Sequence, residues 1–254
     1  ARTSWVYIDG ETFGGVRADI GGDPENPGLN IAWKYLYTAK DTWLGPEQNL
    51  GCCGALTHHM GRDDQARETA RSTIRAFLAA DAEAPLDAII VNTSGCGTVV
   101  KDYGHLFAQD PDRAGAERVA SLARDVTEFL DSHGLPPVTQ PLDLRVAYHA
   151  ACSLQHGQAI RTQPKALLKA AGFEVVEPRD PHLCCGSAGT YSVLHPEIAH
   201  ELRDRKLGNL EATGAKEIVS ANIGCISHLQ SGTKTPVTHW IELIDRALAG
   251  TAAG

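Results

Sequence analysis

Two copies of a Cys-Cys-Gly sequence are the residues of this chain best suited to chemistry. They are Cys52-Cys53-Gly54 and Cys184-Cys185-Gly186. Each copy is followed by a predicted helix, a predicted strand and a Gly-Cys pair, which holds Cys96 in the first copy and Cys225 in the second. The first and last cysteines are 44 positions apart in one copy and 41 in the other. Because this order of elements occurs twice, we infer two related halves, each with its own cysteine group.

The second half has one cysteine more than the first. Cys152 follows a predicted strand at residues 144–149 and lies 32 positions before Cys184. In parallel sheets, ligands bind beyond the carboxyl ends of the strands, which is where these loops are expected. The four thiols expected at one sheet edge are Cys152, Cys184, Cys185 and Cys225. The first half offers only Cys52, Cys53 and Cys96, since no cysteine precedes them.

Grouped thiolates point to a metal. They are soft donors that select zinc, copper(I) or iron–sulfur clusters. Adjacent side chains diverge, so a multi-iron cluster accommodates a Cys-Cys pair more easily than a single tetrahedral ion does, and the glycine that follows lets the backbone turn tightly. The residues therefore favour an iron–sulfur cluster in the second half. Zinc and a purely structural, buried role stay open as alternatives, and zinc is the alternative metal for the first half.

Histidines near the cysteines are weaker candidates. His228 is the best of them, because its C-x-x-H spacing from Cys225 can place both side chains on one helical turn. The others are His58, His59 and His156. Each of these is suited to metal ligation or proton relay, although single histidines are more often found at a surface or a core edge.

Composition excludes several classes of function. Seven cysteines, an odd number, do not fit a closed disulfide framework. A formal net charge of −8 with no basic run argues against a nucleic-acid partner. No stretch approaches the roughly 20 apolar residues of a transmembrane helix. The polar first residues are not typical of a signal peptide. A cytoplasmic location is expected, with any contact to the inner face of the membrane made through partners.

The elements that position the cysteines alternate between strand and helix. Strands are predicted at residues 86–92, 144–149, 173–177 and 217–222. Helices are predicted from Asp63 onward and at residues 119–130, 164–171, 196–213 and 241–248. This alternation indicates an α/β fold: two pseudo-repeated halves with parallel sheets and flanking helices. We expect an atypical N-terminal segment at 1–50, a first Cys-Cys-Gly half at 51–140 and a second at 141–254.

The N-terminal segment differs from the rest of the chain. It holds Trp5, Trp33 and Trp43, three of the four tryptophans, but no cysteine or histidine. Glycine and proline punctuate it, and we predict a short strand at residues 5–8, a turn-rich loop and a short helix at residues 31–37.

Five segments resemble the Cys-Cys-Gly domain family, in the branch of glycolate oxidase iron–sulfur subunits. They are residues 51–56, 94–107, 148–158, 183–192 and 221–232. Relatives in this family include the lactate-utilisation protein and the cysteine-rich subunits of heterodisulfide reductase and of the anaerobic glycerol-3-phosphate dehydrogenase. The resemblance spans about residues 50–250 and leaves residues 1–50 outside it. The C-x-x-C-x-x-C motifs usual in an N-terminal region of such proteins are absent here.

The resemblance implies a non-catalytic subunit of an oxidoreductase complex that oxidises a 2-hydroxy acid such as glycolate. Such a subunit carries electrons from flavin-containing dehydrogenase subunits towards the quinone pool through an iron–sulfur cluster, expected to be of the [4Fe-4S] type. The cluster ligands carried over are Cys152, Cys184, Cys185 and Cys225, while His228 stands where the heterodisulfide reductase relative has a final cysteine. A zinc-binding assembly subunit and a heterodisulfide-reductase-like thiol redox protein are the alternative functions.

Overall fold

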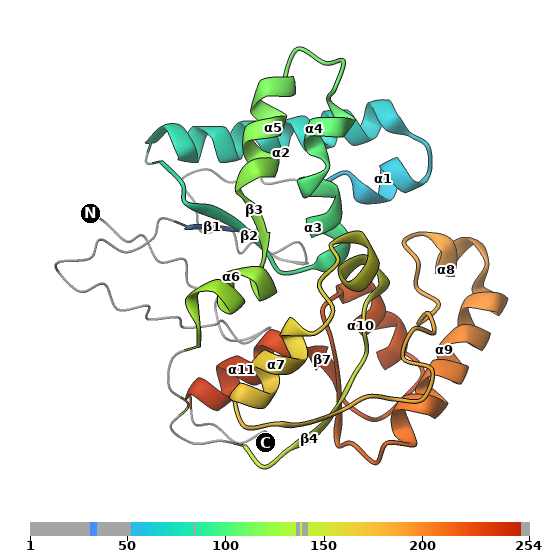
Figure 1. Ribbon diagram of the computed structural model, residues 1–254. Helices are drawn as coiled ribbons and strands as arrows, with labels where there is room; N and C mark the ends of the chain where they lie inside the picture. The colour runs from blue at the N-terminus through green and yellow to red at the C-terminus, as the bar shows by residue number, and fades with distance from the viewer. Residues whose placement is uncertain (1–30, 35–51, 84, 136–137, 139–141, 250–254) are drawn as a thin grey trace. The chain divides into compact units, whose positions relative to one another are not determined.

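The chain folds into two compact units, Ala1–Phe129 and Leu130–Gly254. The structure is a computed structural model that describes residues 31–34, 52–83, 85–135, 138 and 142–249. Each unit contains a parallel sheet with helices packed against it (Figure 1). The predicted fold class, α/β with two pseudo-repeated halves, is therefore confirmed. The boundaries that we expect at residues 50 and 140 stay predictions.

A three-stranded parallel sheet in the order β1-β2-β3 forms the centre of the first unit. Its strands are β1 (Ile31–Lys34), β2 (Ala88–Val91) and β3 (Ala123–Asp125). Its helices are α1 (Ala55–His59), α2 (Asp63–Glu83), α3 (Ser94–Lys101), α4 (Tyr103–Leu106) and α5 (Arg113–Leu122). All four residues of β2 are buried, as is usual for a central parallel strand covered on both faces.

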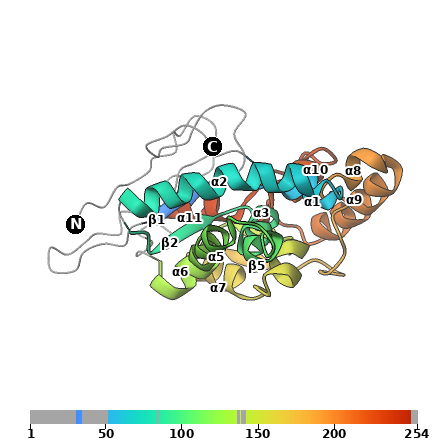
Figure 2. The same ribbon diagram turned by 90° about the horizontal axis from the view of Figure 1, so that it is seen from above.

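Helix α2 begins where the sequence predicts it. Asp63 and Asp64 place negative charge in its first turn, which favours the positive end of the helix dipole. Buried side chains then recur every three or four residues, which gives the helix one apolar face, at Ala66, Ala70, Ile74 and Phe77. This face packs α2 against α1 and α5, and Figure 2 shows α2 as a long helix alongside the sheet.

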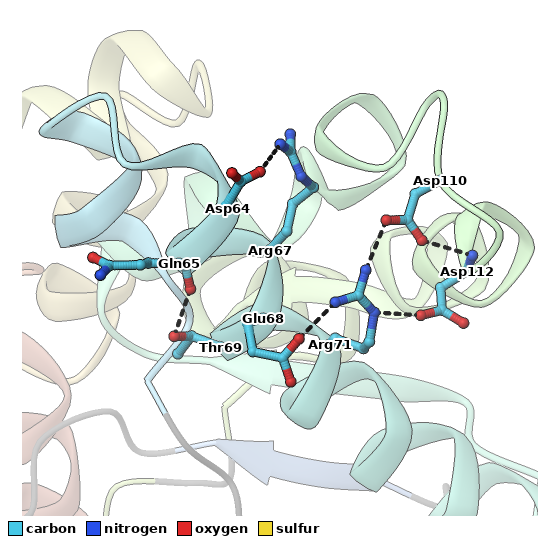
Figure 3. Close-up of polar contacts among 8 residues, drawn as sticks. All are labelled: Asp64, Gln65, Arg67, Glu68, Thr69, Arg71, Asp110 and Asp112. Atoms are coloured by element: carbon cyan, nitrogen blue, oxygen red, sulfur yellow. Dashed lines mark hydrogen bonds and ion pairs between the residues drawn. The ribbon is translucent and has the colours of Figure 1, made fainter.

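Arg71 fixes α2 to the connection that leads into α5 (Figure 3). Its Nη2 donates to Asp110 Oδ2 at 2.7 Å and its Nε donates to Asp112 Oδ2 at 2.6 Å. A third contact joins its Nη1 to Glu68 on the same helix at 2.8 Å, and the guanidinium lies over the ring of Phe107. Charge-assisted bonds of this kind are among the stronger hydrogen bonds in proteins, so they hold α2 firmly beside the first cysteine loop.

The single helix predicted at residues 119–130 is wrong. Helix α5 ends at Leu122, β3 follows, and α6 (Val126–His133) begins after it and crosses the division between the units. Ala123 adopts an extended conformation, and β3 pairs in parallel with β2 from Ile89 to Val91. Pairing of β3 with β2 therefore stabilises the chain more than one continuous helix would. A strand of three residues is also too short to show an alternation of apolar and polar residues in the sequence.

The helix predicted at residues 31–37 is also wrong where the structure describes it. Residues 31–34 form β1, which pairs in parallel with β2 in a register that joins Ile31 to Ala88 and Lys34 to Val91. The remaining residues of that prediction, and the strand predicted at residues 5–8, lie outside the described residues.

A four-stranded parallel sheet in the order β5-β4-β6-β7 forms the centre of the second unit. Its strands are β4 (Arg145–Tyr148), β5 (Glu174–Val176), β6 (Glu217–Ser220) and β7 (Val237–His239). Its helices are the π-helix η1 (Ser153–Gly157), α7 (Gln163–Ala170), α8 (Tyr191–Leu194), α9 (Pro196–Glu211), α10 (Ile223–Gln230) and α11 (Trp240–Ala249). The strands and helices predicted for residues 144–248 are confirmed, with ends that differ by a few residues.

The strand order creates a topological switch point at the carboxyl end of this sheet. From β4 the chain moves to β5 on one side, and from β6 it moves to β7 on the other. Right-handed crossovers then place helices on both faces: α7 packs against α11, and α9 packs against α10, on opposite sides of the strands in Figure 1. Neighbouring connections diverge between β4 and β6, which is where open parallel sheets bind their ligands.

None of the helices in the described part of the chain has both the length and the apolar character needed to cross a membrane.

Candidate metal centre

Three buried donors converge at the switch point of the second unit. His149 directly follows β4, Cys185 lies in the loop after β5, and Cys225 lies in the first turn of α10, after β6. A ring nitrogen of His149 and the two Sγ atoms all lie within 4.8 Å of one another. All three side chains are buried. Residues far apart in the sequence are thus brought together by the parallel pairing of β4 with β5 and β6.

Cys184 stands beside this group of three. Its side chain is half-buried and hydrogen-bonds with Cys185, and the backbone N–H of Gly186 donates to its Sγ at 3.3 Å. Cys225 accepts a longer contact, 3.6 Å, from the Asn222 side-chain amide. N–H donors aimed at sulfur favour the thiolate and are a usual means of tuning metal-bound cysteine.

Gly186 is required by the shape of the cysteine loop. Its φ of 89° lies in the left-handed region, and a Cβ there would come within 2.2 Å of the carbonyl oxygen of Ala199 in α9. Only glycine lets the backbone turn here and pass so close to the helix. Gly224 meets a similar demand in α10, where a Cβ would lie 2.9 Å from Ser187 Oγ.

Contacts among the thiols and burial favour the neutral form of Cys184 and Cys185. The hydrogen bond with Cys185 and burial raise the pKa of Cys184 above its usual range. For Cys185, the hydrogen bond with Cys184 lowers the pKa, but Cys225 and burial outweigh it and the net shift is upward. Neighbouring thiolates repel when no cation offsets them, so binding of a metal cation would release protons from this group.

Lys206 supplies the one buried positive charge that couples to these thiols in the described second unit. Its side chain is fully buried on α9, and its Nζ donates to the backbone carbonyls of Asp180 and Pro181 at 3.2 and 3.0 Å. Burial lowers its pKa, whereas its coupling to the three neighbouring cysteines raises it. Its burial excludes a solvated surface position for this lysine.

His149 was missed by the sequence analysis. Neither of its ring nitrogens has a hydrogen-bond partner among the described residues. Burial, and then the charge of Lys206, lowers its pKa to about 3, so the ring is neutral. The available signal was its spacing: His149 and Cys152 form an H-x-x-C pair directly after a buried strand, the reverse of the C-x-x-H pair at Cys225.

Two predicted ligands lie outside the group of three. Cys152 is exposed and directly precedes η1. His228 Nε2 is 3.1 Å from the carbonyl oxygen of Ala199, and its ring stacks on His200. When Nε2 carries the proton and donates to that carbonyl, Nδ1 is left as an acceptor, which is the arrangement common in metal-binding histidines. Ligand roles for both residues stay predictions.

The cysteines of the first unit are close together but lack a comparable donor group. Cys53 is buried; the hydrogen bond with Cys52 lowers its pKa, but Cys96 and burial outweigh it and raise the pKa to about 12. Neutral hydroxyls hold the loop: Tyr103 donates to the carbonyl of Cys53 at 2.9 Å and Thr73 to that of Cys52 at 3.3 Å. Among the described residues, no set of three donors within 4.8 Å includes these cysteines.

The remaining histidine candidates lie near the surface, and ligand roles for them stay predictions. His58 Nδ1 contacts Asp63 Oδ1 at 3.1 Å, and His59 is exposed. His156, in the second unit, is exposed on η1.

The donor set of the second unit suits a soft or borderline metal. Thiolates and a neutral imidazole bind iron, iron–sulfur clusters and zinc, and they discriminate against magnesium and calcium, which prefer oxygen. A buried histidine whose ring nitrogens have no protein partner, as at His149, is expected where a metal is the partner. The residues present therefore fit a metal or cluster at this position.

Comparisons with known proteins place the same cysteines in a recurring domain. The family model described as the cysteine-rich domain (CCG) matches residues 21–101 and 146–230. The first match begins at residue 21, so the expectation that residues 1–50 lie wholly outside the family is wrong for residues 21–50. The strand β1 belongs to this added part.

Named relatives are found among bacterial proteins. The chain is 41% identical over 224 residues to the glycolate oxidase iron-sulfur subunit of Escherichia coli (strain K12), which is 88% of this chain and 55% of that protein. A Bacillus subtilis counterpart is 34% identical over 214 residues, 81% of this chain and 46% of the other. Lactate utilization protein A of Geobacillus kaustophilus is 32% identical over 181 residues, 70% and 73% of the two chains.

The chain spans about half the length of the glycolate oxidase relatives that it matches. The two matched segments cover both Cys-Cys-Gly loops and both later cysteines, Cys96 and Cys225. This chain therefore belongs to the cysteine-rich (CCG) domain family and carries two copies of its domain.

Proposed function

We propose that this chain is the iron–sulfur subunit, or part of it, of a complex that oxidises a 2-hydroxy acid such as glycolate. In this proposal it carries electrons from a flavin-containing dehydrogenase subunit towards quinone and does not itself bind the acid. The relatives named as iron-sulfur subunits support the assignment. The observation that carries it is the convergence of buried thiols at the switch point between β4 and β6.

The proposed ligands of the second unit are Cys152, Cys184, Cys185 and Cys225, holding a cluster of the [4Fe-4S] type. When bound, the cluster supplies one-electron transfer. The chain's own residues would place it beside the buried Cys185 and Cys225, donate N–H groups to the Sγ atoms of Cys184 (from Gly186) and Cys225 (from Asn222), and hold the Lys206 ammonium nearby. A buried positive charge favours a negatively charged centre and makes its reduction easier.

Zinc is the second candidate, because one observation favours it. The three donors within 4.8 Å of one another are close enough to surround a single tetrahedral ion. In that case the chain would be an assembly subunit with no redox role. The adjacent Cys184 and Cys185 favour the cluster instead, since two neighbouring side chains rarely reach one ion.

Metal analysis of the full chain, purified without oxygen, tests the two candidates. The iron–sulfur proposal predicts a brown protein with matched iron and acid-labile sulfide and a visible absorption that bleaches on reduction. A colourless protein that contains zinc alone and shows no redox transition would contradict it.

An activity measurement tests the assignment as an electron carrier. The pure chain is expected to give no glycolate-dependent dye reduction, because no flavin or nicotinamide motif is visible in it. Addition of a flavin-containing hydroxy-acid dehydrogenase subunit is expected to reduce the chain's own visible chromophore when glycolate is present. Glycolate oxidation by the chain alone would contradict the proposal.

A further inference from the structure

His149 is a buried polar side chain with no hydrogen-bond partner. Both ring nitrogens are unpaired among the described residues, although the residue is 1% exposed. A buried polar group that loses its water without gaining a partner is unfavourable, and native proteins keep such groups for a specific reason. We therefore expect the imidazole of His149 to bind a group other than the protein atoms described.

The position of this ring is set by the sheet and not by a loop. The backbone N–H of His149 donates to the carbonyl of Val219 at 2.8 Å, which extends the pairing of β4 with β6 by one residue. The same strand β6 leads directly to Cys225 in α10. The imidazole and the thiol thus leave adjacent parallel strands at the same edge, in a rigid part of the fold.

The donor distances fit ligation of a common metal ion. A ring nitrogen of His149 and the Sγ atoms of Cys185 and Cys225 lie within 4.8 Å of one another. Metal–sulfur bonds of about 2.3 Å and metal–nitrogen bonds of about 2.0 Å place neighbouring ligand atoms a little under 4 Å apart. Closure by less than about 1 Å per pair would complete such a group. Burial also keeps the imidazole neutral, which is the form that binds metals.

We propose that His149 is a nitrogen ligand of the metal centre in the second unit, the same centre that Cys185 and Cys225 bind. This inference rests on the proposed function in one respect, namely that the centre contains iron. It adds an imidazole to a site for which the sequence predicted thiolates, with His228 as the best nitrogen candidate.

Two substitutions separate ligation from simple packing. His149→Phe keeps an aromatic ring of similar size in the core but removes both nitrogens, while His149→Cys offers a thiolate at the same position. The full chain, purified without oxygen, is expected to lose more than half of its iron in the first variant and to keep most of it in the second. His195→Phe, at an exposed histidine of the same unit, is the matched control and should keep wild-type iron.

Retention of wild-type iron by His149→Phe would overturn the inference. Equal iron loss in His149→Phe and His149→Cys would also overturn it, provided that circular dichroism shows both variants folded. If either variant is unfolded, the spectroscopic test described next decides whether a histidine binds the metal, because its first measurement is made on the native chain.

Pulsed electron paramagnetic resonance of the reduced chain provides a direct test of the bond. Protein labelled with ¹⁵N-histidine is expected to show a strongly coupled nitrogen whose signal changes with the isotope, and His149→Cys is expected to lose it. If iron-loaded protein shows no such coupling, the assignment of His149 as a ligand is overturned but the proposed function is not. A coupling that persists in His149→Cys and disappears in His228→Phe would assign the bond to His228 and also overturn it. Absence of iron from the native chain would overturn this inference together with the proposed function.

Discussion

The two cysteine loops share a backbone design. In both, the glycine after the pair has a positive φ, 85° at Gly54 and 89° at Gly186. In both, a Cβ on that glycine would press against a carbonyl oxygen of the following long helix, that of Ala66 or Ala199. The same turn is therefore packed against the same part of a helix in each unit.

The side chains that support the loops differ in charge. Seven residues after the contacted helix residue, the first unit has Thr73 and the second has Lys206. Each donates hydrogen bonds to backbone carbonyls that lie in the cysteine loop or just before it. A hydroxyl does this without charge, whereas an ammonium adds a positive charge in a region of low dielectric. The second loop is thus suited to hold negative charge, and the first is not.

Sheet register shows a second difference. Lys34 in β1 pairs with Val91, five residues before Cys96. In the second unit, Ser220 lies five residues before Cys225, and the residue opposite it is His149, because Tyr148 pairs with Val219. Lys34 thus takes the register position of His149.

Three residues further along, the first unit has Tyr37 where the second has Cys152. The sequence of the first copy therefore has no equivalent of His149 or Cys152, the two donors that follow β4 in the second copy. The two units share the fold class and the cysteine pair, whereas among the described residues a group of three close donors occurs only in the second unit.

Substitution of the paired cysteines tests this comparison with the largest expected effect. Cys184→Ser and Cys185→Ser are each expected to remove most of the bound iron, because each removes a thiolate from the complete donor group. Cys52→Ser and Cys53→Ser, the matched changes in the first unit, are expected to remove much less. Iron and sulfide are measured per chain after purification without oxygen. Equal losses of iron from the variants of both cysteine pairs would show that the two units bind metal equally.

Substitution of the loop glycines tests the shared design. Gly186→Ala is expected to lower the free energy of unfolding by more than about 3 kcal/mol, because an L residue must adopt positive φ and its Cβ would meet a carbonyl oxygen. The Cβ in Gly54→Ala would meet its carbonyl at 2.7 Å and not at 2.2 Å, so a smaller loss is expected.

Gly61→Ala and Gly214→Ala are the controls for these glycines. Both positions have a φ of 70° but no atom within 4 Å of the added Cβ, so each is expected to cost only about 1–2 kcal/mol. Urea unfolding of the metal-free chain provides the measurement. If Gly54→Ala and Gly186→Ala lower the free energy of unfolding no more than the controls do, the close packing of the cysteine loops against the helices is wrong.

A buried carboxyl group of the first unit is expected to make stability depend on pH. Burial raises the pKa of Asp125, at the end of β3, from an ordinary value of 3.8 to about 6. Between these values the folded chain binds more protons than the unfolded chain, so the free energy of unfolding falls as pH rises from about 4 to 6. The total loss is about 3 kcal/mol at most, and it persists above pH 6.

Asp125→Asn is expected to flatten this dependence. The asparagine keeps an oxygen that accepts from the Thr127 backbone N–H, as Asp125 Oδ1 does at 2.8 Å, and it cannot ionise. Glu174→Gln, at an exposed carboxylate paired with Arg145 on the surface of the second unit, is the control and should leave the slope unchanged. Parallel stability curves for wild type and Asp125→Asn between pH 4 and 6 would mean that Asp125 is not the group responsible.

Substitution of Lys206 sharpens the comparison with the smallest expected effect. In the iron-loaded chain, Lys206→Met is expected to lower the reduction midpoint potential by on the order of tens of millivolts, since removal of a positive charge disfavours an added electron. Lys206→Arg keeps the charge and should restore much of the shift. Thr73→Val, the matched change in the first unit, should leave the potential unchanged, and a shift as large as that of Lys206→Met would remove the distinction between the loops.

Much of the architecture could be predicted because it follows from strong local patterns. Helix α2 is indicated by Asp63 and Asp64 and by a regular apolar face, and β2 by an unbroken apolar run. The repeat of cysteine and glycine located both loops. The prediction failed at β3, where three residues form a strand only because β2 lies beside them.

The site was predicted less completely than the fold. Thiols signal metal by their type, so the group around Cys185 was found. A single histidine such as His149 carries no signal of its own, because its burial and the lack of a partner exist only once β4 and β6 are paired. The role of Lys206 could not be predicted for the same reason: a helix pattern does not show that its ammonium will donate to the loop carbonyls of Asp180 and Pro181.

The strand order β5-β4-β6-β7 also dictates when the second unit can acquire its metal. His149, Cys185 and Cys225 are separated by 36 and 40 positions, so the donors meet only after β6 has inserted beside β4. A centre bound to all three would then cross-link these segments and restrict the unfolded chain, and the entropy of loop closure changes little over such lengths. Folding to the sixth strand must precede loading, and loading in turn makes the sheet harder to take apart.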